Sequence, residues 1–179
     1  ETLGQSDLEV RQDWRLNERH YGALQGLDKK ATTLKYGVEQ TNLWRRSFDV
    51  APPPVDLSSP EHPRNDPRYR NISQNDLPNT ECLKDVVARV VPFYVQYVVG
   101  ELQNNKNVLI TAHGNSLRAL VMHIENLSPE QIAKFNIPTG VPRKYEFSNQ
   151  MKLVTAGYLG DQVAIATAIN AVSGKRKGT

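Results

Sequence analysis

The feature that most constrains the fold is a short apolar run followed at once by a polar string and a helical pattern. Val108-Leu109-Ile110-Thr111-Ala112 stands between polar ends, as in a buried and parallel β-strand. His113-Gly114-Asn115-Ser116 comes next, and the apolar positions from Leu117 to Ile124 then repeat with helical spacing. This order predicts an α/β sheet that carries a polar site at the carboxyl end of one strand.

The remaining patterns predict one α/β domain over residues 1–179, with a mostly parallel sheet covered by helices on both faces. We expect helices over 29–46 in two pieces separated by Gly37, over about 80–104 with Thr80 as N-cap and a kink at Pro92, at 128–134, and over 161–172. A hairpin is expected through Asn149-Gln150. The segment 48–79 is rich in Pro, Asp, Asn and Ser and predicts a long irregular loop.

The first residues predict a chain that begins inside a larger unit. Residues 1–7 suit the tail of a helix and a turn, and the strand-like Leu8-Glu9-Val10 follows directly. No methionine precedes them.

Charge and cysteine content exclude several classes of function. The chain has 22 basic and 19 acidic side chains and a net charge of +3. Part of that surplus lies in Lys175-Arg176-Lys177, which suits a solvated basic tail over 173–179. Because the basic residues are not interleaved with aromatic ones, we expect no nucleic-acid partner. The single cysteine, Cys82, excludes a disulfide within the chain and suits a reducing compartment. Its place at a helix start could lower the pKa of its thiol, although a structural role is the commoner one.

No apolar run approaches the ~20 residues of a membrane span. We therefore expect a cytoplasmic protein without a leader peptide or a membrane partner.

His113 and its neighbours form the first candidate site. The N-terminus of the helix that follows offers free N–H groups and a positive dipole end to an anion, and His113 could donate to a phosphoryl oxygen or transfer a proton. The alternative is that His113 caps the strand and Asn115 starts the helix. Spacing alone does not separate these two interpretations.

A second candidate is Glu18-Arg19-His20-Tyr21, in which a carboxylate for proton transfer stands beside a guanidinium for an anion. Taken alone, such a string is more often a solvated charged turn. The third is Arg45-Arg46, at the end of a predicted helix with Lys29 upstream, which could grip phosphate or simply complement the helix dipole. The four histidines lack metal-ligand spacing, so no metal is expected.

Several long strings in the same order resemble the 2,3-bisphosphoglycerate-dependent phosphoglycerate mutases of the histidine phosphatase superfamily. They are Arg15-Leu16-Asn17-Glu18-Arg19-His20-Tyr21-Gly22, Leu24-Gln25-Gly26, Trp44-Arg45-Arg46-Ser47-Phe48-Asp49, Pro52-Pro53-Pro54, Glu81-Cys82-Leu83-Lys84-Asp85, Ala112-His113-Gly114-Asn115-Ser116-Leu117-Arg118, Asn136-Ile137-Pro138-Thr139-Gly140 and Tyr158-Leu159-Gly160-Asp161. The resemblance covers nearly the whole chain and implies a three-layer α/β fold.

The resemblance also implies a reaction, the interconversion of 3-phosphoglycerate and 2-phosphoglycerate in glycolysis and gluconeogenesis. The substrate is a small phosphorylated carboxylic acid, and 2,3-bisphosphoglycerate primes a phosphohistidine enzyme. Glu18 matches the general acid/base and His113 the second active-site histidine. Substrate-binding positions are matched by Arg19, Tyr21, Lys29, Arg45, Arg46, Gly114 and Asn115. The basic tail matches a mobile segment that closes over the site, and a homodimer or homotetramer is typical of the family.

One departure from the family pattern is large. The family opens with a strand ending in Arg-His-Gly-Glu, whose histidine is the nucleophile, and no such string occurs here. We therefore expect this motif upstream in the parent protein and no turnover by the 179 residues alone. The alternatives are a bisphosphoglycerate synthase or phosphatase on the same scaffold, and a truncated, non-catalytic paralogue that acts as an interaction protein.

Overall fold

The computed structural model describes residue 4 and residues 7–174, apart from the side chains of residues 29 and 172–174. The α-helices are α1 (Lys29–Tyr36), α2 (Val38–Arg46), α3 (Leu83–Phe93), α4 (Val99–Gln103), α5 (Gly114–Ile124), α6 (Pro129–Lys134) and α7 (Gln162–Gly174). The strands are β1 (Arg143–Phe147) and β2 (Leu153–Tyr158), and a π-helix, η5 (Tyr94–Val98), joins α3 to α4. Four short 3-10 helices complete the order, namely η1 (Trp14–Leu16), η2 (Gly22–Leu24), η3 (Pro63–Asn65) and η4 (Pro67–Tyr69).

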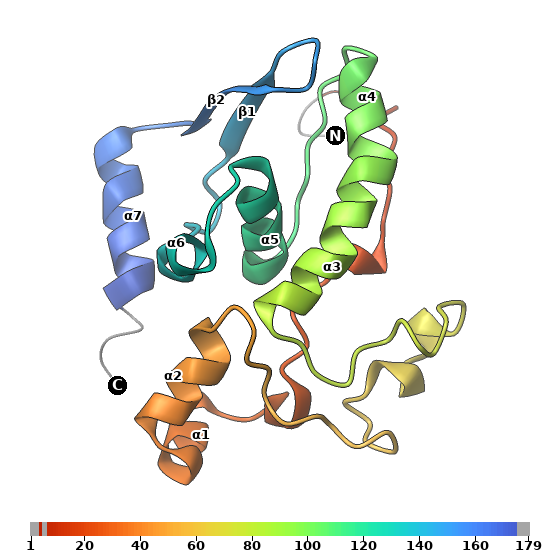
Figure 1. Ribbon diagram of the computed structural model, residues 1–179, viewed down its shortest axis with the longest axis vertical. Helices are drawn as coiled ribbons and strands as arrows, with labels where there is room; N and C mark the ends of the chain where they lie inside the picture. Colours follow the sequence, from red (N-terminus) through yellow and green to blue (C-terminus); the bar gives the residue numbers. More distant parts are fainter. Residues whose placement is uncertain (1–3, 5–6, 175–179) are drawn as a thin grey trace.

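The core lies between α3 and α5, which pack side by side (Figure 1). Its buried members are Leu83, Val86, Val90, Phe93, Tyr94, Val98, Ala119, Leu120, Val121 and Ile132. The positions on α3 recur every three or four residues, so one face of the helix is apolar, as the sequence predicts. Burial of that face removes it from water, which is the main force that joins the two helices.

Pro92 disturbs the long helix at the expected place. A proline lacks the N–H that an α-helix needs in its interior and crowds the preceding turn. The helix continues through Pro92 to Phe93, becomes a π-helix over Tyr94–Val98 and returns to α-helical geometry in α4. The predicted kink therefore takes the form of a wider turn.

The sheet is smaller than the sequence predicts. Among the described residues it has two strands, β1 and β2, paired antiparallel with Arg143 opposite Tyr158. The hairpin through Asn149-Gln150 is thus confirmed. The parallel strand expected at Val108–Ala112 is wrong for this structure, because that segment pairs with no other described strand and Leu109 is 81% exposed. Residues 8–10 also lie outside any sheet.

Helices together with a small sheet agree with the predicted α/β class. The two-piece helix over 29–46 is confirmed, with Gly37 between the pieces at φ +81°. The capping pattern at Ser128 is confirmed, since its hydroxyl accepts from the Gln131 N–H (3.3 Å). Thr80, however, is not the cap of α3, because its hydroxyl donates to Pro52 O (2.7 Å) and the helix begins at Leu83.

The segment 48–79 crosses the lower part of Figure 1 and contains only η3 and η4 as regular elements. Gly22 allows this segment to pack closely against the N-terminal part of the chain. A Cβ at Gly22 would lie 2.1 Å from Pro53 O, and Gly22 has φ +59°, so glycine alone fits. The basic tail predicted over 173–179 lies almost wholly outside the described residues.

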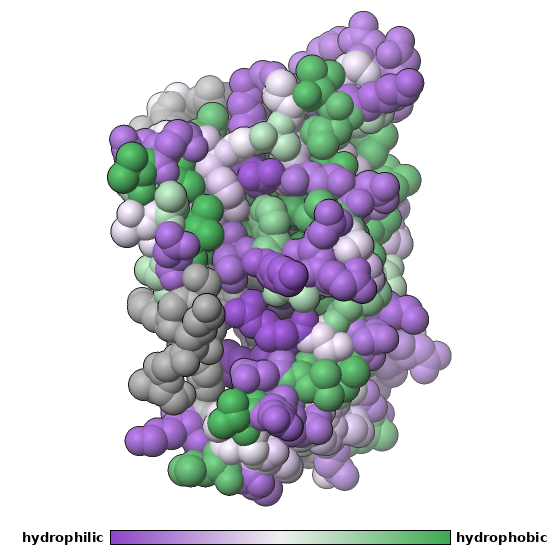
Figure 2. All heavy atoms as spheres, turned by 60° about the vertical axis from the view of Figure 1, so that its left-hand side comes forward, coloured by the Kyte–Doolittle hydropathy of each residue, from purple (hydrophilic) through white to green (hydrophobic). Residues whose placement is uncertain are grey.

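Apolar and polar groups are interspersed on the side of the molecule where α7 lies (Figure 2). Val163 and Val154 contribute exposed apolar surface on α7 and β2. No helix in the described part of the chain is long and apolar enough to cross a membrane.

Candidate active site

Glu18 lies where the N-terminal irregular segment meets the start of α5. Its carboxylate oxygen Oε1 accepts from the Arg19 N–H (2.7 Å) and from the Asn115 N–H (3.2 Å). Asn115 is the second residue of α5, so the carboxylate occupies the positive end of the helix dipole. Glu18 is half-buried and lines a cleft, which leaves it accessible to a small molecule. These contacts orient an accessible carboxylate, as proton transfer requires.

His113 is the N-cap of α5 and is exposed. Its backbone N–H donates to Ser116 Oγ (3.3 Å), and its side chain lines the same cleft as Glu18. Gly114 follows directly, and a Cβ there would lie 3.9 Å from Glu18 Oε2. The two candidate sites that the sequence suggested separately, around His113 and around Glu18, thus form a single site.

Asn115 is fixed by both ends of its side chain. Its Nδ2 donates to the Tyr21 hydroxyl (3.1 Å), and its Oδ1 accepts from Arg118 Nη1 (3.1 Å). Arg118 also donates to Ile132 O on α6 (2.6 Å). Tyr21, Asn115 and α6 therefore belong to one hydrogen-bonded unit beside Glu18.

Arg19 combines burial with unused hydrogen-bonding capacity. It is 2% exposed, and its Nη1 donates to Trp44 O (3.1 Å). Its guanidinium lies 4.6 Å from the centre of the Tyr21 ring. Nε and Nη2 have no hydrogen-bond partner among the described residues. Buried donors without partners are costly, and an anion bound here would satisfy them.

The arginine pair on α2 lies near this region. Trp44, whose carbonyl accepts from Arg19, directly precedes Arg45. Arg46 Nη1 donates to Ala133 O on α6 (3.4 Å), so its guanidinium points toward α6. Lys29 begins α1, and its side chain lies outside the described part.

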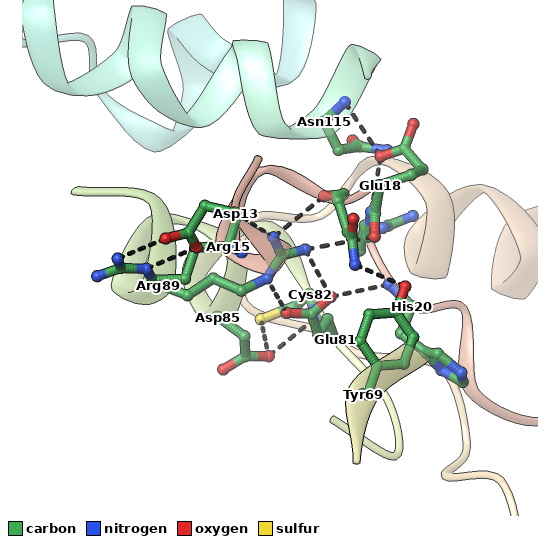
Figure 3. A network of polar contacts seen from close by, with 12 residues as sticks. Asp13, Arg15, Glu18, His20, Tyr69, Glu81, Cys82, Asp85, Arg89 and Asn115 are labelled. Carbon is green, nitrogen blue, oxygen red and sulfur yellow. Dashed lines mark hydrogen bonds and ion pairs between the residues drawn. The ribbon is translucent and has the colours of Figure 1, made fainter. Parts of the chain in front are cut away.

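Behind Glu18 lies an ion pair that the sequence did not single out. Arg89 lies on α3 and Glu81 lies just before it. Arg89 Nε is 2.6 Å from Glu81 Oε1, and the two side chains are 8% and 3% exposed (Figure 3). Both contact the backbone that carries Glu18. One signal was present, since Arg89 stands inside an otherwise apolar stretch of α3.

A cleft of about 460 Å³ opens beside Glu18, and Glu81 and Arg89 also line it. The loop 56–79 supplies much of its far wall, including His62 and Tyr69. His62 is 2% exposed, and burial together with nearby His20 and Arg64 lowers its pKa. His20 Nδ1 accepts from the Gly22 N–H (3.0 Å), which places the ring proton on Nε2, 3.1 Å from Glu61 O.

Cys82 corrects one expectation. It stands at the helix start, but burial and the hydrogen bond from its Sγ to Asp85 Oδ2 (3.0 Å) raise the pKa of the thiol. The helix dipole does not lower the pKa of the thiol overall, because Cys82 is 4% exposed and its thiol faces the Asp85 carboxylate. Cys82 therefore has the environment of a structural cysteine.

No group of three His, Cys, Asp or Glu side chains arranged for a metal ion occurs in the part of the chain that the structure describes.

Comparisons with known proteins show the family of the chain. Residues 56–156 match the histidine phosphatase superfamily (branch 1). The chain is 49% identical over 175 residues to the 2,3-bisphosphoglycerate-dependent phosphoglycerate mutase of Borreliella afzelii (strain PKo) and 50% identical to that of Borreliella burgdorferi (strain ZS7). Each comparison covers 98% of this chain and 71% of the relative. The chain therefore belongs to the 2,3-bisphosphoglycerate-dependent phosphoglycerate mutases of the histidine phosphatase superfamily.

Proposed function

We propose that the protein interconverts 3-phosphoglycerate and 2-phosphoglycerate, as an isomerase primed by 2,3-bisphosphoglycerate. The observation that carries this proposal is the convergence of three groups. A carboxylate (Glu18) and an exposed histidine (His113) meet at the N-terminus of α5. The buried guanidinium of Arg19, with two unused donor nitrogens, stacks on Tyr21, whose hydroxyl accepts from Asn115 at the same helix end. The region thus contains a proton carrier and an anion-binding group.

The residues present fit a phosphorylated cofactor. Arg19 Nε and Nη2 are buried donors without a hydrogen-bond partner among the described residues. The exposed start of α5 adds backbone N–H groups and the positive end of the helix dipole. When bound, 2,3-bisphosphoglycerate supplies the phosphoryl group that primes the enzyme. Arg19, Tyr21, Gly114 and Asn115 are its proposed binding residues near Glu18, and Lys29, Arg45 and Arg46 are proposed from the family match.

Glu18 is the proposed general acid/base. Its Oε1 is occupied by two N–H donors, whereas no hydrogen bond to Oε2 is formed by the described residues. Oε2 is thus the oxygen that would exchange a proton with the substrate hydroxyl. His113 is the proposed donor to the phosphoryl oxygens, which carry the negative charge during transfer.

The test is turnover by the full-length gene product, with a trace of 2,3-bisphosphoglycerate and 3-phosphoglycerate as substrate. We expect 2-phosphoglycerate to appear faster than inorganic phosphate or additional bisphosphoglycerate. A faster phosphatase or synthase reaction, or no reaction, would overturn the proposal. The 179 residues alone should not turn over, because they contain no Arg-His-Gly string.

The surroundings of the reaction are also proposals. We propose a cytoplasmic homodimer or homotetramer without nucleic-acid or membrane partners, and one domain over 1–179 with its irregular loop at 48–79. Light scattering of the purified protein measures the subunit number. A monomer at micromolar concentration would contradict the oligomer.

A further inference from the structure

We propose that Arg89 and Glu81 are positioning residues that fix Glu18 in its reactive place. The proposal rests on the proposed function, because it assigns these residues a role through the acid/base. Both residues border the cleft, but all five N–H groups of Arg89 and both carboxylate oxygens of Glu81 are hydrogen-bonded within the protein. Their effect therefore passes through the backbone of residues 15–20. We call the two residues the Arg89–Glu81 pair.

The backbone around Glu18 has little regular structure of its own. Residues 17–21 follow η1 and precede η2 without forming a helix or a strand. The peptide groups of such a segment need hydrogen-bond partners from elsewhere when they are removed from water. The conformation of Glu18 therefore depends on the groups that meet this backbone.

Arg89 meets it with its guanidinium. Nη1 donates to Arg15 O (2.5 Å) and to Asn17 O (3.0 Å), and Nη2 donates to Glu18 O (3.3 Å). Nε and Nη2 also donate to the two carboxylate oxygens of Glu81, at 2.6 and 3.0 Å. An arginine has five N–H donors, and these five bonds use all of them.

Glu81 secures the residue on the other side. Its Oε2 accepts from the His20 N–H (2.8 Å), and its own N–H donates to His20 O (2.9 Å). The backbone is thus held before and at Glu18 by Arg89 and after Glu18 by Glu81, and the two side chains lie next to each other (Figure 3). Because Arg89 belongs to α3, which packs on α5, the carboxylate of Glu18 is set against the helix end that binds it.

The fixed geometry of arginine makes the assignment specific. Lysine carries the same charge but has three donors on a single nitrogen. It cannot reach three carbonyls and both oxygens of a carboxylate at once. Glutamine at position 81 keeps the shape of glutamate, yet it replaces one acceptor oxygen with an NH₂ group that would face an N–H donor.

The experiment compares Arg89→Lys and Glu81→Gln with wild type in the full-length gene product, by steady-state kinetics with 3-phosphoglycerate. We expect kcat to fall about 10- to 100-fold, the scale of a misplaced catalytic group, while KM changes less than about threefold because the substrate-binding groups are untouched. Glu81→Gln is the milder change and provides the test if Arg89→Lys does not fold.

The matched control is Arg143→Lys. Arg143 forms an ion pair with Glu125 (2.9 Å), with side chains 18% and 16% exposed, and lies away from the cleft. Its replacement should change thermal stability without changing kcat. An equal loss of kcat in this control would show a general effect of disturbed ion pairs and would overturn the inference.

A double-mutant cycle separates positioning from general support. In a Glu18→Gln background, Arg89→Lys should change the residual kcat less than about twofold, because the group it positions is gone. The same fold-loss in both backgrounds, or an unchanged kcat in Arg89→Lys, would overturn the inference. A wild-type protein without mutase turnover would instead overturn the proposed function, and this inference with it.

Discussion

Two buried arginines flank Glu18, and they differ in how completely their donors are used. Arg89 uses all five N–H groups on backbone carbonyls and on Glu81. Arg19, which is 2% exposed, has one hydrogen bond to Trp44 O and leaves Nε and Nη2 without partners among the described residues. A saturated guanidinium is part of the scaffold, whereas one with unmet donors is prepared for a ligand. Burial alone does not distinguish the two roles.

The largest effect is expected for Glu18, the residue that the two arginines flank. Glu18→Gln keeps the acceptor oxygen for the Asn115 N–H but removes the proton carrier, so kcat should fall by about 10²–10⁴-fold. Steady-state kinetics measure it, and Glu39→Gln, an exposed change in the first turn of α2, is the control. If kcat is retained, neither side of Glu18 has the function assigned to it.

The next largest effect is on stability and is expected for Arg89, whose N–H groups are all hydrogen-bonded. Arg89→Met leaves Glu81 buried without its cation, which should lower the free energy of unfolding by ~3–5 kcal/mol. Urea denaturation of the variant and wild type measures the difference. A loss below about 1 kcal/mol would remove the distinction between the two arginines.

Replacement of Arg19 should affect stability less than replacement of Arg89, but it should clearly weaken substrate binding. Arg19→Met loses one hydrogen bond and the contact with Tyr21, but it also removes two unsatisfied buried donors, so stability should stay within about 1 kcal/mol of wild type. Loss of charged hydrogen bonds should raise the Kd for 3-phosphoglycerate by about tenfold or more. Calorimetric titration measures the Kd, and an unchanged value would assign Arg19 to the scaffold.

The smallest effect is expected in acid, at the neighbouring ion pair of Asp13 and Arg15. Burial raises the pKa of Asp13, but hydrogen bonds and charge from Arg15 outweigh it and hold that pKa below its usual range. A lowered folded-state pKa gives stability above the unfolded value of about 3.9 that is lost as the pH falls through the folded pKa. Asp13→Asn should therefore flatten the fall in stability below pH ~4, by less than about 1 kcal/mol.

Urea midpoints between pH 2 and 6 measure this slope. An unchanged slope in Asp13→Asn would contradict the stabilising role assigned to the Asp13–Arg15 pair.

Local patterns predicted the local parts of this molecule. Gly37 between two helical pieces, the capping residues at Ser128 and the hairpin at Asn149-Gln150 depend on neighbours within a few residues. The positions of Glu18 and His113 were also expected, from the resemblance, and the hydrogen bond from the Asn115 N–H to Glu18 brings them together.

The non-local parts could not be predicted in the same way. The apolar run at Val108–Ala112 has the composition of a strand, but a strand requires a partner, and none of the described residues pairs with it. Arg89 could not be assigned either, because its backbone acceptors lie more than 70 residues earlier in the chain. Thr80 is a residue type that commonly caps helices, yet its hydroxyl donates to the Pro52 carbonyl instead.

Glu18 is bound to α3 through its carbonyl and to α5 through its carboxylate. Any sliding or tilting of one helix against the other must therefore change the distance between Glu18 Oε1 and the Asn115 amide. The ¹⁵N chemical shift of that amide becomes a local measure of how the two core helices are seated. Core substitutions far from the cleft, such as Val86 or Ala119, should be detectable there before they alter the overall stability of the protein.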